Sequence, residues 1–380
     1  MATERKTIAI PYNFNPNWMG GVIYIVNTIK MLNWLNEDDK PNIKLFYRRE
    51  LQKYVDELNY PYLEKIPTHF PDLKKGYLNS WFSGKNKFIH NIAIQKDVHA
   101  VFPVMDSPVS FSRYPDTRLV SWVADLQHKF YPEFFTIKKR FERELRIRMT
   151  ISNSEHLVIS SQDVLNGISR HYNLKGTNTH IYHFASIIDD FDFSGWDKLR
   201  TEKGLPQQYF MVCNQFLKHK NHIVVLKALV ELKKRGLKVN VAFTGDIIGD
   251  LSSEYTNNLH QYINDNQLSE QVFFLGILSR QQQLTLMKHC KAIIQPSLFE
   301  GWSTVIEDAI SIQKPVIASN IEVNIEQLGN KAAFFDPFDP FELSQLIQDD
   351  LKGLIDKRLI YEPYDKRIAK AAMSFMSVFQ

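Results

Sequence analysis

Residues 292–309 read AIIQPSLFEGWSTVIEDA, in which a short apolar run is followed by a polar turn and then by an amphipathic segment. The run AIIQPS has the composition of a buried strand, and Pro296 ends it. After the turn, apolar residues recur at the spacing of a helix, at Val305, Ile306, Ala309 and Ile310. The stretch therefore predicts a strand, a tight turn and a helix in direct succession.

Short apolar runs alternate with longer amphipathic segments along the rest of the chain, which is typical of parallel α/β layers. In the first half we predict strands at residues 6–12, 43–49, 99–104, 118–126, 156–161 and 179–185. In the second half we predict them at residues 209–214, 239–245, 272–276, 292–297, 315–320 and 332–337. The polar residues 63–91 form a long excursion in which no helix can be placed.

The alternation is interrupted at residues 187–208, a polar segment that fits neither the strand period nor the helix period. We therefore predict two Rossmann-like domains, an N-terminal one over residues 1–186 and a C-terminal one over residues 187–359. Open parallel sheets bind ligands beyond the carboxyl ends of their strands. Two such domains facing each other would form a cleft lined by strand-to-helix turns, and functional residues are expected there.

The composition describes a folded globular protein whose charges nearly balance. Hydrophobic residues make up 44% of the 380 residues, and the formal net charge is +4. This balance argues against nucleic acid as the main partner, but it allows anionic small molecules or weak attraction to an acidic membrane surface. Cys213 and Cys290 form no disulfide framework, and neither an apolar leader nor a membrane-spanning run occurs. A cytoplasmic protein is expected, with any membrane contact peripheral at the inner face of the cell membrane.

Three acids surround the turn in the quoted stretch, with Glu300 before it and Glu307 and Asp308 after it. The turn precedes a helix, whose free N–H groups and dipole favour a phosphate. Carboxylates would repel that phosphate, so we expect them to accept hydrogen bonds from neutral hydroxyls beside it, such as those of a sugar and a ribose. The alternative is ordinary helix capping by Ser303 or Thr304, with acids in the first turn.

The stretch CNQFLKHKNH, residues 213–222, follows the first predicted strand of the second half. It places Lys218, His219 and Lys220 at a strand-to-helix turn, where a lysine can neutralise a leaving diphosphate. The alternative is a solvated basic loop. His219 and His222 are three residues apart in the sequence, but a third nearby ligand is lacking, so no metal site is predicted.

Two further turns carry glycines where a helix N-terminus could meet an anion or a sugar hydroxyl. Gly20 and Gly21 open an amphipathic segment after the first strand, and Gly245 belongs to the turn TGD at residues 244–246. A tight turn without any ligand explains the glycine pair equally well.

Polar residues also follow a strand of the first half. Asp125, Gln127 and His128 come directly after it, and Pro132 fixes the loop, so we expect these side chains on the acceptor or sugar side of the cleft. A purely structural role for the histidine is an equal alternative.

The next segment, residues 135–149, concentrates six basic residues in one helix-like run. It can be a surface for a membrane or a lipid phosphate. It can also be a solvated helix whose charge is balanced by Glu142 and Glu144.

These motifs together resemble the large family of group 1 glycosyltransferases, retaining enzymes with the GT-B fold, and especially bacterial mannosyl- and rhamnosyltransferases of surface polysaccharides. The resemblance covers nearly all of the chain and is strongest near residue 300. It runs through NWMGGVIYIVNTI, VADLQHKFYPEFF, NQFLKHKNH and PSLFEGWSTVIEDAISIQKPVIASNI. It implies a transferase that moves a sugar from a nucleoside diphosphate sugar to a hydroxyl of a glycan or lipid-linked glycan, with neither metal nor cofactor.

The resemblance also implies roles for individual residues. Lys220 would meet the diphosphate, Glu300 the sugar hydroxyls, and the backbone after Glu300 the phosphate. A last helix at about residues 360–380 would cross back to the N-terminal domain. We take Lys220, Glu300 and His128 as the catalytic residues. The predicted donor-binding residues are Gly20, Gly21, Gln215, Lys218, His219, Gly245, Gly301, Trp302, Ser303, Thr304, Glu307 and Asp308.

The chain departs from the family pattern at two positions. Gln215 stands where the family commonly has an arginine, so Lys218 or His219 would have to compensate. The family's second acid lies eight residues after the first, which is Asp308 here, but Glu307 is longer and adjacent, so both remain candidates for the ribose hydroxyls. The missing arginine supports one alternative function, a catalytically silent GT-B-like protein that binds a sugar nucleotide.

Overall fold

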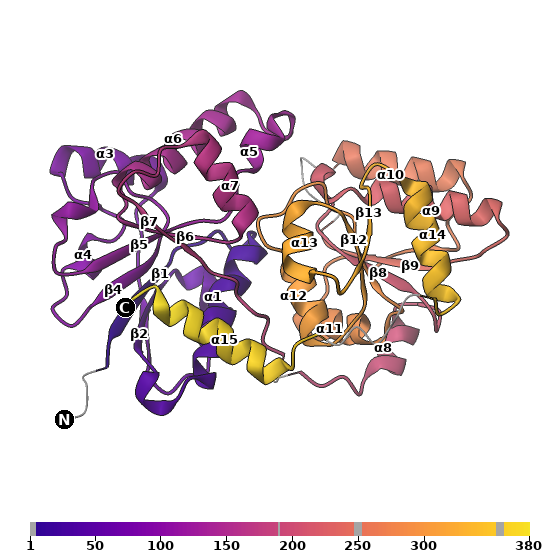
Figure 1. The fold of residues 1–380 in the computed structure, drawn as a ribbon, viewed down its shortest axis with the longest axis horizontal. Helices are drawn as coiled ribbons and strands as arrows, with labels where there is room; N and C mark the ends of the chain where they lie inside the picture. The colour runs from indigo at the N-terminus through magenta and orange to yellow at the C-terminus, as the bar shows by residue number, and fades with distance from the viewer. Residues whose placement is uncertain (1–4, 189–190, 247–252, 355–360) are drawn as a thin grey trace. The chain divides into compact units, whose positions relative to one another are not determined.

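The computed structural model describes residues 5–188, 191–246, 253–354 and 361–380. The chain divides into two compact units (Figure 1). Unit 1 comprises Met1–Ala185 together with Pro363–Gln380, and unit 2 comprises Ser186–Glu362. Each unit has its own parallel sheet, so the predicted fold class of two Rossmann-like parallel-sheet domains is confirmed.

Unit 1 contains a seven-stranded sheet in the order β3-β2-β1-β4-β5-β6-β7. Successive strands are added outward on both sides of β1, as in a doubly wound fold, and all six residues of β1 are buried. The strands are β1 (Thr7–Tyr12), β2 (Asn42–Tyr47), β3 (Leu63–Pro67), β4 (Ala100–Val104), β5 (Arg118–Val123), β6 (His156–Ile159) and β7 (Asn178–Ile181).

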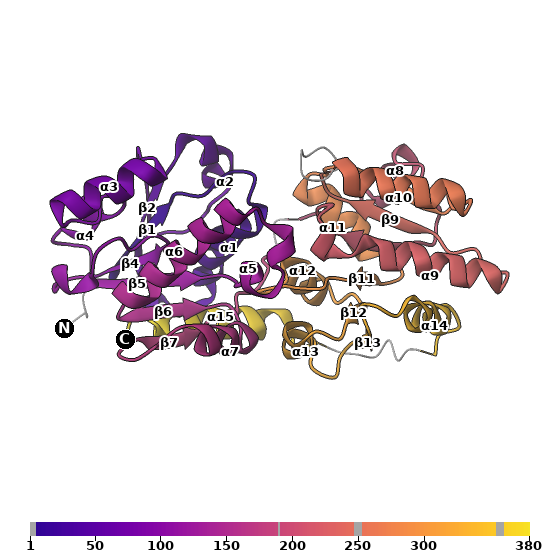
Figure 2. The same cartoon turned by 90° about the horizontal axis from the view of Figure 1, so that it is seen from above.

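Helices cover both faces of this sheet, with α1 and α15 on one face and α3 and α6 on the other (Figures 1 and 2). The helices are α1 (Met19–Met31), α2 (Gln52–Asp56), α3 (Leu73–Ser83), α4 (His90–Ala93), α5 (Gln127–Phe130), α6 (Ile137–Asn153), α7 (Gln162–His171) and α15 (Tyr364–Ser377). Short 3₁₀ helices lie at Leu32–Trp34, Glu37–Asp39, Arg49–Leu51, Phe111–Arg113 and Pro132–Phe134.

The C-terminal helix α15 belongs to unit 1, as the family resemblance implied. It buries an apolar face at helical spacing, in which Phe375 meets the ring of Phe102 at a centroid distance of 5.4 Å. The Lys6 ammonium donates a hydrogen bond to the carbonyl oxygen of Phe379 at 2.8 Å, which fastens the end of the chain to the start of β1. The predicted start of the helix, at about residue 360, lies outside the described residues.

Unit 2 contains a six-stranded sheet in the order β10-β9-β8-β11-β12-β13, with buried apolar clusters on its two faces. The strands are β8 (Phe210–Cys213), β9 (Val241–Thr244), β10 (Val272–Phe274), β11 (Ile293–Gln295), β12 (Val316–Ser319) and β13 (Ala333–Phe335). The helices are α8 (Trp196–Glu202), α9 (His222–Lys234), α10 (Ser253–Asp265), α11 (Arg280–His289), α12 (Thr304–Ser311), α13 (Glu322–Leu328) and α14 (Pro340–Leu351), with a 3₁₀ helix at Lys218–Lys220.

Each of the twelve predicted strands overlaps an observed strand, but the polar segments are more ordered than predicted. β3 and α3 lie inside the predicted excursion of residues 63–91, and α8 lies inside the predicted boundary segment. β3 was missed because it is an edge strand that pairs with β2 alone and exposes Glu64 and Lys65, so it carries almost no apolar signal. Residues 189–190 of the boundary segment lie outside the described residues.

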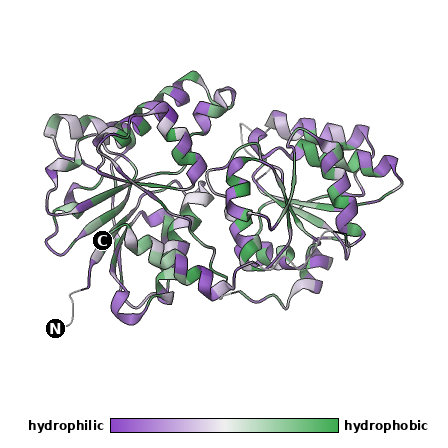
Figure 3. Cartoon of the chain, in the orientation of Figure 1, coloured by the Kyte–Doolittle hydropathy of each residue, from purple (hydrophilic) through white to green (hydrophobic). Residues whose placement is uncertain are grey.

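Hydropathy follows the layers of each unit. The strands of both sheets are mostly hydrophobic, whereas the helices combine hydrophobic and hydrophilic stretches (Figure 3). Within the described part of the chain, no helix combines the length and the apolar composition that crossing a bilayer requires.

Candidate functional site

The turn between β11 and α12 ends in a helix cap. Ser303 is the N-cap residue, and its hydroxyl oxygen accepts a hydrogen bond from the backbone N–H of Ile306 at 3.3 Å. The backbone N–H of Ser303 donates to Oε1 of Gln327 at 3.1 Å. Capping is therefore confirmed, by Ser303 rather than Thr304. It leaves the N–H groups of Thr304 and Val305 without an acceptor inside α12, because the first turn of a helix has none to offer.

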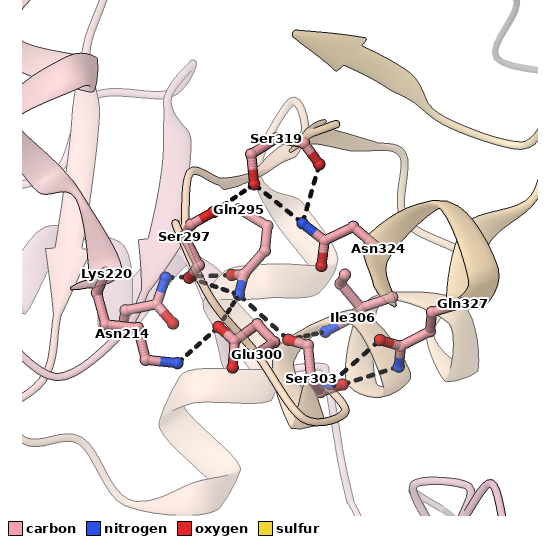
Figure 4. A network of polar contacts seen from close by, with 10 residues as sticks. All are labelled: Asn214, Lys220, Gln295, Ser297, Glu300, Ser303, Ile306, Ser319, Asn324 and Gln327. Atoms are coloured by element: carbon pink, nitrogen blue, oxygen red, sulfur yellow. Dashed lines mark hydrogen bonds and ion pairs between the residues drawn. The ribbon is translucent and has the colours of Figure 1, made fainter. Parts of the chain in front are cut away.

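Lys220 and Glu300 form an ion pair beside this turn (Figure 4). Lys220 follows β8 and Glu300 follows β11, and these two strands are neighbours at the centre of the sheet. The two loops are joined by the backbone N–H of Leu298, which donates to the carbonyl oxygen of His219 at 2.8 Å. Nζ of Lys220 lies 2.6 Å from Oε1 of Glu300, and both side chains are mostly buried. The structure thus brings together two of the three predicted catalytic residues.

The buried Gln295 at the end of β11 donates a hydrogen bond to the Glu300 carboxylate (Figure 4). Its Nε2 lies 2.8 Å from Oε1 of Glu300 and 3.2 Å from the hydroxyl oxygens of Ser297 and Ser303. Its Oε1 accepts a hydrogen bond from the amide of Asn214 at 3.1 Å. Sequence reasoning missed this residue, although a polar residue at the end of an otherwise apolar strand was a usable signal, because a buried amide needs partners.

A second buried network supports the same loop from the next strand. The Ser319 hydroxyl donates to the carbonyl oxygen of Ser297 at 2.6 Å. The Asn324 amide donates in turn to the carbonyl and hydroxyl oxygens of Ser319, both at 3.0 Å (Figure 4). The loop that carries Glu300 is therefore fixed by side chains from β11, β12 and α13, and a loop fixed in this way can hold a carboxylate in one position.

Asp308 points away from the turn and toward α11. Both of its oxygens accept hydrogen bonds from the guanidinium of Arg280, and its side chain is 1% exposed. Burial alone would lower the pKa of Arg280, but the Asp308 carboxylate outweighs burial and raises that pKa. This bidentate ion pair joins α11 to α12. It engages both oxygens of Asp308, the acid at the position that the family pattern assigns to ribose binding.

Glu307 stays with the turn. Its Oε1 accepts hydrogen bonds from the indole N–H of Trp302 at 3.1 Å and from the amide of Gln327 at 2.8 Å. Its side chain is buried as well, so neither acid of α12 is part of a solvated helix start. Binding of the ribose hydroxyls by either acid stays a prediction. Glu307 has one partner in the turn itself, Trp302, and its other partner, Gln327, lies on α13.

The other predicted donor residues of unit 2 line the ends of β8 and β9. Gln215 and Lys218 are exposed there. Gly245 has a φ of 141°, and a Cβ at this position would lie 2.3 Å from the carbonyl oxygen of Asn214. The close approach of two strand ends thus requires this glycine, and a ligand is not needed to explain it.

The predicted residues of unit 1 form a network of their own. Nε2 of His128 lies 3.2 Å from a carboxylate oxygen of Glu144, its Nδ1 has no hydrogen-bond partner among the described residues, and the ring is buried. Burial lowers the pKa of His128, against the opposing effect of Glu144. Asp125 accepts a hydrogen bond from Arg143 at 2.7 Å, and Gln127 lies beside it at the start of α5. The catalytic role of His128 stays a prediction.

Gly20 and Gly21 lie in the first turn of α1, and Gly21 has a packing role. A Cβ at Gly21 would lie 2.5 Å from the indole ring of Trp18, whereas a Cβ at Gly20 would meet nothing closer than 3.7 Å. Trp18 stacks on Trp122 at a centroid distance of 5.6 Å. Gly21 leaves room for this indole, which explains the glycine without a ligand. The indole does not explain Gly20 in the same way, and a ligand role for Gly20 stays a prediction.

Comparison with known families and sequences places these residues in context. The family described as "Glycosyl transferases group 1" matches residues 197–370, which include every site residue of unit 2. The O-antigen chain mannosyltransferase RfbU of Salmonella typhimurium is 26% identical over 218 residues, which is 57% of this chain and 56% of that protein. The alpha-1,3/1,6-mannosyltransferase ALG2 of Mus musculus is 23% identical over 210 residues, which is 52% and 50% of the two chains. The chain therefore spans about half the length of the curated relatives it matches.

Solved structures match over nearly the whole chain. A glycosyltransferase from Rickettsia africae has a TM-score of 0.68 at 15% identity and covers 99% of this chain and 96% of its own. HepE from Anabaena in complex with UDP has a TM-score of 0.65 at 17% identity and covers 98% and 94%. At these identities the likeness establishes the fold that these glycosyltransferases share.

Proposed function

We propose that the chain is a group 1 glycosyl transferase, the family that matches residues 197–370, and that it transfers a sugar from a nucleoside diphosphate sugar to a hydroxyl of a glycan or lipid-linked glycan. One observation carries the proposal. Lys220 and Glu300, a cation for the diphosphate and a carboxylate for the sugar, are paired at 2.6 Å beside the N-terminus of α12.

The diphosphate is assigned to Lys220 and to the first turn of α12. The N–H groups of Thr304 and Val305 and the helix dipole supply fixed positive ends, which suit a phosphate. The Lys220 ammonium is held near them by Glu300 in the free protein, and a diphosphate oxygen would take over part of that contact. These donors would stabilise the charge that grows on the diphosphate as it leaves.

The transferred sugar is assigned to Glu300. Its Oε1 is taken by Lys220 and Gln295, whereas among the described residues no hydrogen bond reaches its Oε2. Oε2 therefore keeps its lone pairs for sugar hydroxyls, and Gln295 keeps the carboxylate from rotating away. The ribose hydroxyls fall to Glu307 in this scheme, because Asp308 is occupied by Arg280.

The reaction we propose retains the configuration of the sugar and needs no bound metal. The bond from the anomeric carbon to the diphosphate oxygen breaks, positive charge develops at that carbon, and the acceptor oxygen forms a new bond on the same face. The departing phosphate takes the proton of the acceptor hydroxyl. Charge stabilisation by Lys220 and the helix N–H groups is the main catalytic contribution.

The test measures nucleoside diphosphate release from UDP-, GDP- and dTDP-sugars, with and without glycan and lipid-linked acceptor extracts, and in the presence of EDTA. We expect release that depends on acceptor and persists in EDTA, and a product whose anomeric configuration, read by NMR, matches that of the donor. Binding without release would favour the silent sugar-nucleotide-binding protein. An inverted product would contradict retention, and activity lost to EDTA and restored by Mg²⁺ would contradict metal independence.

A further inference from the structure

Two helices of unit 1 expose large apolar side chains. On α6, Ile137 and Phe141 are 85% and 68% exposed, and Leu145 continues the same stripe at a spacing of four residues. On α3, Leu78, Trp81 and Phe82 are 49%, 49% and 89% exposed, and Leu78 is three and four residues from the other two. Scattered single residues of this kind are ordinary on a protein surface, but a stripe on each of two neighbouring helices marks an interaction site.

The two helices are fastened to each other through one buried carboxylate. Asp106 accepts a hydrogen bond from the Tyr77 hydroxyl of α3 at 2.9 Å and from the Arg146 guanidinium of α6 at 2.7 and 3.0 Å. Both helices cover the same face of the sheet, opposite α1 and α15 (Figures 1 and 2). We call this the α3–α6 surface, made by the exposed residues Lys74, Lys75, Leu78, Trp81, Phe82, Ile137, Lys138, Lys139, Arg140, Phe141 and Leu145.

The α3–α6 surface is strongly positive, and only some of its basic side chains form ion pairs within the protein. α6 carries six basic and two acidic residues, a net charge of +4 that equals that of the whole chain. Arg143, Arg146 and Arg148 are paired with carboxylates of unit 1. The other three basic residues of α6 have no ion-pair partner in the described part of the chain, and the same holds for the two exposed lysines of α3. These five are Lys138, Lys139, Arg140, Lys74 and Lys75.

We propose that the α3–α6 surface docks on an anionic lipid bilayer. Exposed apolar side chains interleaved with unpaired cations are what an interfacial helix needs, because the apolar groups enter the acyl boundary while the cations meet lipid phosphates. A second copy of this chain fits the surface poorly, since a two-fold contact would bring these cations against themselves. The proposal does not rest on the proposed function, because its readout is binding to vesicles rather than sugar transfer.

The experiment is co-sedimentation of the full chain with vesicles of phosphatidylcholine alone or mixed with phosphatidylglycerol. We expect binding to the anionic vesicles only, weakened by added salt, which screens the attraction. Neutralising three cations in K138Q/K139Q/R140Q should weaken partitioning by about 100-fold, since each basic residue near an anionic surface contributes about 1 kcal/mol. Removing apolar groups in F82S/I137S/F141S should weaken it by about tenfold or more.

The matched control is F338S, which removes a 74% exposed phenylalanine of unit 2 and should leave vesicle binding unchanged. Thermal unfolding of each variant checks that the fold persists, and the charge variant, whose residues are all exposed, is the one least able to disturb it. Absence of binding to anionic vesicles, equal binding by the triple variants and the wild type, or an equal loss in F338S would overturn the proposal. So would a wild-type dimer that F82S/I137S/F141S converts to a monomer, because the surface would then be covered by a second copy.

Discussion

The loop after β11 in unit 2 and the loop after β5 in unit 1 both join a buried strand to a helix through polar residues, but they distribute their hydrogen bonds differently. In unit 2, Glu300 is held through one oxygen, and no hydrogen bond from the described residues reaches the other, which we propose binds the sugar. In unit 1, His128 and Lys129 of α5 contact Glu144, a carboxylate of the following helix α6, which also accepts hydrogen bonds from Tyr172 and Arg148. The first arrangement leaves a carboxylate oxygen available for hydrogen bonds from outside the chain, and the second uses a carboxylate to hold the chain together.

The partners of Glu144 within the chain also stabilise its ionised form. Burial would raise its pKa, but hydrogen bonds from Lys129, Tyr172 and Arg148 outweigh burial and lower the pKa to about 2. Such a group stabilises the fold above its ordinary pKa of about 4.3 and loses that contribution as the pH falls toward 2. Glu144 is therefore a structural charge at any pH at which the protein would work.

The largest expected effect separates the acids of α12. D308N should cost about 3 to 5 kcal/mol of unfolding free energy, because it removes the buried carboxylate and leaves the partly buried Arg280 guanidinium without its charge partner. E307Q keeps an oxygen that can accept the hydrogen bonds from Trp302 and Gln327, so it should cost much less unfolding free energy. Urea unfolding of the two variants measures the difference. Equal stabilities would mean that Asp308 is not the structural member of the pair and that the ribose assignment must be reversed.

The next effect concerns the cation of the site. K220A should cost about 2 to 4 kcal/mol of transition-state stabilisation, measured as a fall in kcat/KM for sugar transfer, while the fold persists because Gln295 still donates to the Glu300 carboxylate. K227A removes an exposed lysine of α9 in the same unit and serves as the matched control. Steady-state rates of nucleoside diphosphate release give both values. Near-wild-type turnover of K220A would remove Lys220 from the mechanism.

E300Q tests the open carboxylate oxygen. The amide keeps the shape of the side chain but mimics an acceptor-only group in part, so transfer should lose about 1.5 to 3 kcal/mol. The loss should depend on the sugar of the donor, and affinity for the free nucleoside diphosphate should be nearly unchanged. Comparing donor kinetics with calorimetric binding of the free nucleotide separates the two effects. A variant that loses nucleotide affinity as strongly as transfer would place Glu300 on the diphosphate instead.

The smallest effect is a pH dependence carried by His222, which stacks on Phe216 and is fully buried in unit 2. Burial lowers its pKa to about 3. Between that value and the ordinary pKa of about 6.5 the unfolded chain binds more protons, so stability is complete above pH 6.5 and falls on acidification. From pH 6.5 to 5.5, the wild type should lose about 1 kcal/mol more unfolding free energy than H222F. Urea titrations at each pH measure the unfolding free energies. If these fell in parallel for the wild type and H222F as the pH decreased, His222 would not carry the pH dependence.

The sequence predicted what depends on local periodicity and missed what depends on long-range pairing. The strand, turn and helix around Glu300 were predictable, since Pro296 and the apolar spacing after Ser303 are local signals. The bond between Asp308 and Arg280 was not, because the partners lie 28 residues apart on separate helices. Gln295 was missed for the same reason, because its role follows from Asn214, directly after β8, and from Ser303, the N-cap residue of α12. The contact between Gly21 and Trp18 was not predictable either, because it follows from side-chain packing, and a ligand role for Gly21 stays a prediction.

We propose that Lys220 and the first turn of α12 bind the diphosphate of a sugar nucleotide. Calorimetric titration of the wild type, K220A and K227A with UDP, GDP and dTDP measures this binding without any transfer step. We predict that the wild type and K227A bind one of these nucleotides equally well and that K220A binds it at least about tenfold more weakly, a loss of about 1.4 kcal/mol. Equal affinity of K220A and the wild type, or no binding of any of the three nucleotides by the wild type, would contradict the claim.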